Sequence, residues 1–422
     1  MRAVRVGICG LLIFAVLAFG AVEEWSQAVV EAGAALLLVL WSLLQFLRKS
    51  EQLTIPVELL PLGAFAVVVL AQLVFHLTAS SYDTRVGLQL LLTYMIVIFL
   101  LAQAFTRTRH YKNLLWFLMS AGFLVSLFAI LQFLTFNGKL YWFREIHSRS
   151  MAFGPYVNRN HFAGFAELII PMSLVPLALG KVRRERRLLV ALFALVPIVA
   201  LVLSASRGGI VSFVVEIAVL FLLLRLSQTR RKHVIAAGVV VLIAMMAVSW
   251  VGVQQVIQRF SGTQALEVTV GKRAAMRRDT WKMFLDYPVL GTGLGTFQRV
   301  FPPYDSAYDG KIVNHAHNDY LEALSEAGIL GGLCCFWFLG VVIRNSLQSL
   351  ADPKSSLEAM LNLSGLVGCC GMLVHSLVDF NLQIPANALL FFISAHLATA
   401  QIQPTRKEAQ EGVPERIRPR NH

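Results

Sequence analysis

Apolar stretches long enough to cross a bilayer recur along almost the whole chain, and this feature restricts the fold more than any other. A transmembrane helix needs about 20 predominantly apolar residues, because its backbone polar groups must be paired where no water is available. Hydrophobic residues make up 57% of the 422 residues and charged residues only 14%. Soluble domains carry about a quarter charged residues. The sequence therefore predicts an all-α polytopic membrane protein with one integral membrane domain, 1–422.

The apolar runs predict about twelve transmembrane segments. They lie at 6–22, 27–47, 56–77, 86–105, 113–135, 162–180, 188–205, 209–226, 233–252, 320–343, 359–379 and 385–402. The first run follows Arg2 and Arg5 and could also be a signal peptide, but we favour an uncleaved span. A long loop, 253–319, separates the ninth and tenth segments, and a basic tail, 403–422, follows the last.

The positive charges indicate the orientation of these segments. Most of the 37 Lys and Arg residues lie on connections that share a side with both termini, including the cluster 181–187. Because short cytoplasmic connections are enriched in Lys and Arg, we expect both termini in the cytoplasm and the loop 253–319 outside. The net charge of +13 then reflects topology, and no nucleic-acid partner is expected. The five cysteines all lie in apolar runs and are expected to be small core residues.

A polar cluster at 314–322 lies where the tenth segment begins. It holds two imidazoles, His315 and His317, with the amide of Asn318 and two carboxylates. We expect Asp319 and Glu322 to form a capping-box-like pair, which places His317 just before a helix N-terminus. The helix dipole favours a neutral imidazole that can accept a proton, whereas Asp319 favours the charged form. The alternative is an ordinary loop or capping histidine.

Two further polar motifs lie at outer ends of segments. Residues 158–161 lead into the sixth segment and supply the candidate substrate-binding residues Asn158, Arg159, Asn160 and His161. Arg207 follows the seventh segment and precedes two glycines. The free backbone N–H groups of the following helix could bind an anion together with its guanidinium. The alternative is an arginine that extends to the membrane surface.

The long loop contains a basic, helix-like stretch at 272–282. Arg277 and Arg278 are candidates for phosphate contacts, because an arginine fork suits bidentate binding of phosphate. The alternative is an amphipathic helix that binds lipid headgroups. Within the segments, Glu216 lies about 13.5 Å along a helix from Arg207 and needs a partner, a proton or a polar cavity. His375 and Asp379 are four residues apart, so we expect them to share a helix face and to pair.

These residues resemble the motifs of the O-antigen ligase family of bacterial envelope glycosyltransferases, which includes Wzy-like polymerases and pilin-type oligosaccharyltransferases. Its histidine motif is matched by His317, Asn318, Gly328 and Gly331, and its Ser-Arg-Gly by residues 206–208. Its Arg, Trp and Pro-x-x-Gly-x-Gly pattern is matched by Arg277, Trp281, Pro288, Gly291 and Gly293. The resemblance extends from Asn158 to Gly332 and implies a GT-C-like fold in the bacterial inner membrane.

The resemblance implies transfer of a glycan from a polyprenyl-diphosphate lipid to an acceptor at the periplasmic face. His317 is then the general base, and the diphosphate is bound by Arg207 and by Arg277 or Arg278. The acceptor is a lipid A core sugar, a growing polysaccharide or a protein, and His315 is a second candidate base or a substrate ligand like Asn318. The reaction is inverting and needs neither a metal nor a cofactor.

A transporter or channel is the competing function. Intramembrane polar residues such as Glu216 and His375 could line a permeation path. The long outer loop and the lack of an inverted repeat in the sequence favour the enzyme instead.

Overall fold

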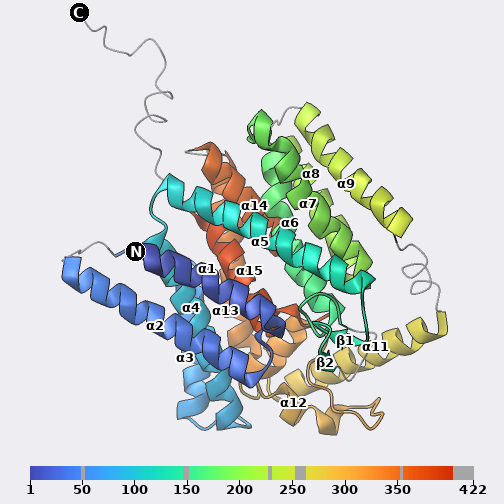
Figure 1. The fold of residues 1–422 in the computed structure, drawn as a ribbon. Coiled ribbons are helices and arrows are strands. Elements are labelled where there is room, and N and C mark those ends of the chain that lie inside the picture. Colours follow the sequence, from blue (N-terminus) through green and yellow to red (C-terminus); the bar gives the residue numbers. More distant parts are fainter. Residues whose placement is uncertain (49–52, 146–151, 227–230, 252–262, 352–354, 403–422) are drawn as a thin grey trace, which may run out of the picture.

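The protein is a bundle of helices, described by a computed structural model over residues 1–48, 53–145, 152–226, 231–251, 263–351 and 355–402 (Figure 1). The predicted basic tail, 403–422, lies outside the described residues. The α-helices are α1 (Arg2–Leu17), α2 (Glu24–Arg48), α3 (Leu59–Val74), α4 (Ser81–Ala104), α5 (Thr108–Leu134), α6 (Arg159–Ala178), α7 (Arg187–Leu203), α8 (Arg207–Leu226), α9 (Arg231–Val251), α11 (Thr263–Asp286), α12 (Phe297–Val300), α13 (Asp319–Ala351), α14 (Ser356–His375) and α15 (Pro385–Thr399).

Each predicted transmembrane run coincides with one helix, from α1 to α9 and from α13 to α15. Within the described residues, 8 helices are long and apolar enough to cross a membrane by length and composition. Helices α3, α9 and α15 are apolar but shorter. The polytopic helical membrane class is therefore confirmed, and the number of segments that span the bilayer stays a prediction.

Helices α6 and α14 form the centre of the bundle. Every residue in the most apolar part of α6 is buried, and α6 packs against α5, α7, α8, α9, α14 and α15. Such complete burial explains why α6 tolerates Ser173 and Glu167 among its apolar residues, since both face protein and not lipid. Helix α14 packs against α6, α8 and α15. Helices α1 and α2 lie at one side of the bundle and α9 at the other (Figure 1).

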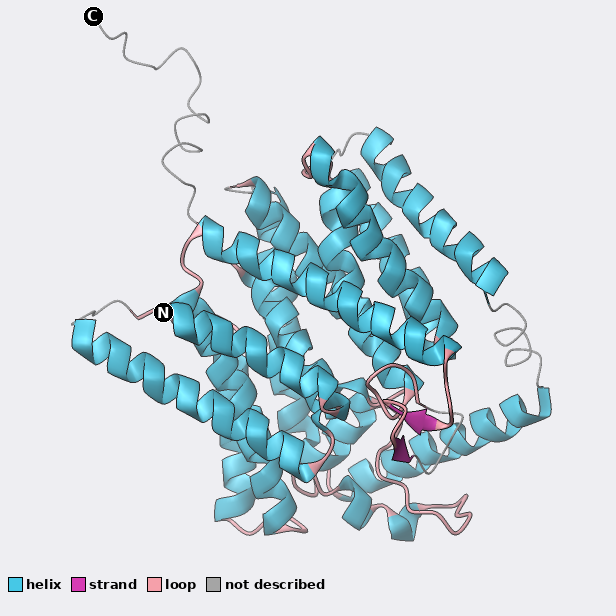
Figure 2. Ribbon diagram, in the orientation of Figure 1, coloured by secondary structure: helices cyan, strands magenta, loops and turns pink. Residues whose placement is uncertain are grey.

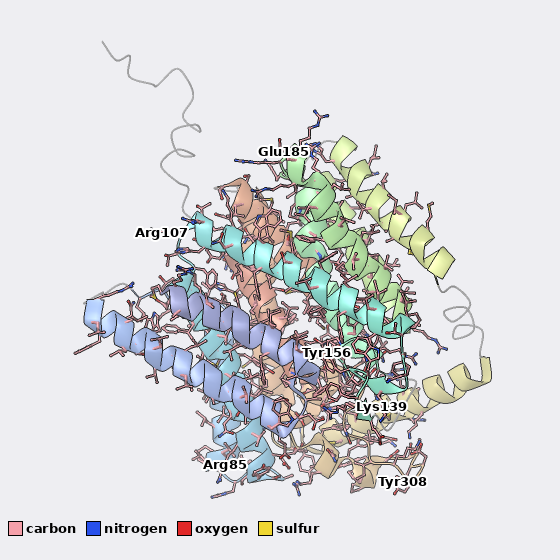
Figure 3. All side chains as sticks on the ribbon, in the orientation of Figure 1. Arg85, Arg107, Lys139, Tyr156, Glu185 and Tyr308 are labelled. Atoms are coloured by element: carbon pink, nitrogen blue, oxygen red, sulfur yellow. The ribbon has the colours of Figure 1, made fainter. Side chains whose placement is uncertain are left out.

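The connections gather at two opposite ends. Arg107 and Glu185 lie at one end, and Arg85 and Tyr308 lie at the other (Figure 3). This arrangement agrees with the predicted separation of the cluster 181–187 from the long loop. The second end also carries α11, which runs across the bundle instead of along it (Figure 1). A short hairpin, β1 (Lys139–Leu140) with β2 (Arg144–Glu145), lies between α5 and α6 (Figure 2).

Helix α13 is interrupted at Gly328, whose φ of 62° is in the left-handed region. The segment 288–293 fills the interruption: Pro288 and Val289 accept the amides of Ile329 and Leu330, while Gly293 donates to Glu326. The approach is close, because a Cβ on Gly328 would lie 2.2 Å from the Val289 oxygen. The backbone groups freed by the break are thus paired again, which membrane helices require. Gly328 and the segment 288–293 together fix the conformation of the first turns of α13.

Candidate active site

His317 lies on the short loop that precedes α13. Its φ of 49° is left-handed, a conformation that is uncommon for a residue other than glycine. Asn318 follows and caps α13, because its side-chain oxygen accepts the Leu321 amide at 2.9 Å. The Asn318 amide group also donates to the Leu377 carbonyl at 2.9 Å. The loop is therefore held in a strained conformation and tied to the turn that follows α14.

The imidazole of His317 pairs with the carboxylate of Asp379. The distance from Nδ1 to Oδ1 is 3.1 Å, and the Asp379 side chain is 1% exposed, whereas His317 is 25% exposed. A carboxylate at Nδ1 holds the proton there and leaves Nε2 as the proton acceptor. This is the arrangement of a histidine general base with an orienting acid.

Asp379 is held as a carboxylate by several partners. Its second oxygen accepts a hydrogen bond from the Asn160 amide, and an Arg273 nitrogen lies 3.7 Å away. Burial alone would raise the pKa of Asp379, but the hydrogen bond and charge of His317, together with Arg273, hold the pKa well below its usual value. The carboxylate therefore stays ionised beside the histidine.

The predicted pairing of His375 with Asp379 is wrong. Helix α14 ends at His375, and a turn carries Asp379 away from it toward His317. The His375 ring instead lies 3.0 Å from Glu167 on α6, with both side chains fully buried. The spacing of four residues indicated a shared helix face, but the helix stops one turn before Asp379.

The predicted pairing of Asp319 with Glu322 is also wrong, because each carboxylate has another partner. Asp319 accepts from the Ser376 hydroxyl at 2.7 Å and from the Leu382 amide at 3.2 Å. These contacts join the start of α13 to the segment after α14. Glu322 instead binds the loop that precedes its own helix.

Glu322 forms a second histidine–carboxylate pair with His315. Its Oε1 lies 2.7 Å from His315 Nδ1, and its Oε2 accepts the Ala316 amide at 2.7 Å. Burial alone would lower the pKa of His315, but the charge and hydrogen bond of Glu322 outweigh it and raise the pKa. The His315 ring stacks on Phe380 at 4.4 Å, and the His317 ring meets the same phenyl ring edge-on at 4.9 Å.

Helix α11 brings the basic stretch of the long loop to this site. Arg273 donates to the Val378 carbonyl at 2.8 Å, one residue before Asp379. Met276 on α11 and Ala316, which precedes His317, belong to one buried apolar cluster. Arg277 is half-buried and lies one helical turn from Arg273, whereas Arg278 is exposed. The loop thus folds back over the histidines.

The first turn of α6 approaches the site from the other side. Asn158 caps this helix by accepting the Asn160 amide at 3.0 Å, and Asn160 binds Asp379. His161 is buried and meets the Phe380 ring at 4.9 Å. The Arg159 Nε atom is buried with no hydrogen-bond partner among the described residues. The predicted motif 158–161 therefore reaches the Asp379–Phe380 turn.

Arg207 begins α8, and Ser206 caps this helix by accepting the Gly209 amide at 3.2 Å. Gly208 allows α8 to approach α14, since a Cβ there would lie 2.8 Å from His375 Nε2. Further along α8, Glu216 is 1% exposed and packs against Gly371 of α14, near Glu167. The structure therefore places Arg207 near the end of α14 at His375. Asp379 follows His375 by four residues.

Sequence reasoning did not identify Asp379, Phe380 or Arg273 as members of the site. The available signal was an acid followed by an aromatic residue where an apolar run ends, which is weak without the fold. A separate cleft of about 490 Å³, lined by residues that include His76 and Tyr287, lies between the α3–α4 turn and the segment 287–292. Among the described residues, no group of three or more His, Cys, Asp or Glu is arranged to hold a metal ion.

Comparison with known protein families gives a match over one segment of the chain. Residues 177–336 match the family model described as O-antigen ligase. The matched segment contains Arg207, Arg277, Arg278, His315 and His317, whereas Asn158 to His161 and Asp379 lie outside it. A search among curated proteins gives no significant match.

Proposed function

Because residues 177–336 match the O-antigen ligase family model, we propose that this membrane protein is a glycosyltransferase. It moves a glycan from a polyprenyl-diphosphate lipid to an acceptor hydroxyl. The reaction takes place at the periplasmic face of a bacterial inner membrane, with both termini in the cytoplasm. The observation that carries the proposal is the His317–Asp379 pair, which lies under a basic helix at the end of the bundle.

His317 acts as the general base. Its Nε2 takes the proton of the acceptor hydroxyl while the acceptor oxygen attacks the anomeric carbon of the glycan. The bond from that carbon to the phosphate oxygen breaks, and its electron pair leaves on the polyprenyl diphosphate. A single displacement of this kind inverts the anomeric centre. Asp379, 3.1 Å from Nδ1, stabilises the imidazolium that forms.

Arginines bind the diphosphate and stabilise the charge that develops on it. Arg207 supplies a guanidinium beside the N-terminus of α8, where free N–H groups also favour anions. Arg277 is the better candidate on α11, because it is half-buried one turn from Arg273, while Arg278 is exposed. The proposed reaction uses neither a metal nor a cofactor.

The six substrate-binding candidates divide by their contacts. Asn158, Asn160 and Asn318 are engaged in helix caps or with Asp379, so we assign them to positioning. His161 is buried against Phe380 and supports the same turn. Arg159 and His315 remain for direct contact with substrate.

The main alternative is a transporter. The polar residues that could line its permeation path are Glu167, Glu216 and His375. Each is at most 1% exposed, and they pack together among α6, α8 and α14. Their packing supports a structural role, since polar pairs join helices within membranes.

The test is reconstitution of the purified full chain in proteoliposomes with a polyprenyl-diphosphate-linked oligosaccharide and each acceptor class. We expect wild type to release polyprenyl diphosphate and to form a glycosylated acceptor, and His317→Ala to lose this transfer. Transfer by His317→Ala at near the wild-type rate would overturn the proposal. Anion uptake without consumption of the lipid donor would favour the transporter. Product analysis in a deletion strain then identifies the acceptor.

A further inference from the structure

Two histidine–carboxylate pairs flank one phenyl ring in the site. His317 with Asp379 meets the edge of Phe380, and His315 with Glu322 stacks on its face at 4.4 Å. The proposed reaction uses only the first pair. The second pair is also firmly positioned, because Glu322 is 2% exposed and contacts both the His315 ring and the Ala316 amide.

The contacts of His315 define which of its atoms can meet a ligand. Nδ1 faces Glu322 at 2.7 Å, so the proton on this atom is held by the carboxylate. The side chain is 30% exposed, which leaves Nε2 as the atom able to bind a ligand. One face of the ring is covered by Phe380. A protonated His315 thus presents one N–H donor with a fixed direction.

We infer that His315, held by Glu322, is an anion-binding residue that donates a hydrogen bond from Nε2 to a phosphate oxygen of the lipid diphosphate. This inference rests on the proposed function, because it places the diphosphate beside the general base. The His315 imidazolium adds to the arginines a cation on the same loop as His317. A charge-assisted hydrogen bond of this kind contributes enough to change affinity about tenfold or more.

The charged form of His315 is favoured by its surroundings. The acidic groups that act on it most strongly belong to α13, namely Glu322, Glu326 and Asp319. The other imidazoles near it are His161 on α6 and His317 on its own loop. Because Glu322 is the closest charge, its replacement by Gln is expected to lower the pKa of His315 and to weaken anion binding at neutral pH.

The first experiment measures binding of farnesyl diphosphate to the purified full chain in detergent, without a glycan. We expect His315→Asn to weaken this binding about tenfold or more, while His76→Asn, which removes an exposed histidine at the same end, leaves it unchanged. Wild-type affinity in His315→Asn would overturn the inference. A loss of affinity for a phosphorylated glycan with unchanged farnesyl diphosphate binding would overturn the assignment to the donor.

The second experiment follows the ratio of wild-type to His315→Asn affinity against pH, which cancels the titration of the ligand itself. We expect the ratio to fall toward one as pH rises through the pKa of His315, and to fall at lower pH in a Glu322→Gln background. A midpoint that does not move in Glu322→Gln would overturn the role of the pair. If Glu322→Gln does not fold, the pH dependence of the wild-type ratio alone decides, and a flat ratio overturns the inference.

The test of the His315 anion site and the test of the proposed function can fail independently of each other. If His317→Ala still transfers glycan but His315→Asn binds diphosphate weakly, the anion site stands and the proposed base is wrong. If His317→Ala loses transfer while His315→Asn binds and transfers like wild type, only the further inference fails.

Discussion

The Nδ1 atom of His317 lies 3.1 Å from Oδ1 of Asp379, although 62 residues separate them in the chain. Two local features create this contact. His317 adopts a left-handed backbone conformation in the loop before α13, and the end of α14 at His375 leaves Asp379 in a turn. Asn160 and Arg273, from α6 and α11, complete the surroundings of the carboxylate. Three other parts of the chain therefore converge on one acid.

Asp379→Asn is expected to reduce the transfer rate at least about 100-fold, because an amide cannot stabilise the imidazolium and can reverse the tautomer of His317. The measurement is kcat in proteoliposomes. Asp309→Asn, which alters an exposed carboxylate in the loop that precedes α13, should stay within about twofold of wild type. In a His317→Ala background the Asp379 substitution should add little, since residues that act as a unit are not additive. Full additivity would contradict the pair.

The stability that Asp379 contributes is expected to persist in mild acid. Its pKa in the folded protein is lowered well below the ordinary 3.8. A group with a lowered folded pKa stabilises the protein above its unfolded pKa, and this contribution is lost as pH falls through the folded pKa. The difference in unfolding temperature between wild type and Asp379→Asn should therefore not decrease as pH falls from about 7.5 to 5. A difference that disappears within this range would show that the carboxylate takes up a proton earlier.

The helices could be predicted from sequence, because apolar runs are local patterns. His317 could be named as a candidate base for a similar reason, since a polar cluster at a helix end is also local, and its role stays a prediction. Each predicted run coincides with one helix, whereas the sequence leaves open whether the long loop folds over His317, which the contacts of α11 show. The partner of His317 could not be predicted. Asp379 shares a spacing of four with His375, so the local pattern favoured the wrong pair, and only the helix end at His375 decides otherwise.

The glycines illustrate the same limit. Gly291 and Gly293 match a family pattern in the sequence, but glycines at such a spacing suit many loops and do not by themselves indicate a structure. Gly291 has a φ of 70° and fits against the Glu326 backbone, where a Cβ would lie 2.3 Å from the carbonyl carbon. The need for glycine at position 291 depends on the interruption of α13 at Gly328. Sequence periodicity does not reveal a helix break that is filled by a distant segment.

Gly328→Ala is expected to destabilise the protein by at least about 2 kcal/mol, because a left-handed φ and a collision with the Val289 oxygen act together. The measurement is thermal unfolding in detergent. Gly340→Ala lies in the same helix with nothing within 4 Å of the added atom and should leave the unfolding temperature nearly unchanged. Equal stability of the two variants would mean that α13 can close its interruption without loss.

Arg277→Ala and Arg278→Ala are expected to differ, since helix geometry separates two adjacent side chains by about 100°. Arg277 shares its face with Arg273, which reaches the Asp379 turn, whereas Arg278 is exposed on α11. We expect Arg277→Ala to lower kcat/KM for the lipid donor about 100-fold and Arg278→Ala to lower it less than about threefold. Arg277→Lys should recover only part of the activity, because lysine cannot form a bidentate phosphate contact. A larger effect at Arg278 would move the proposed phosphate contact to the outer face of α11.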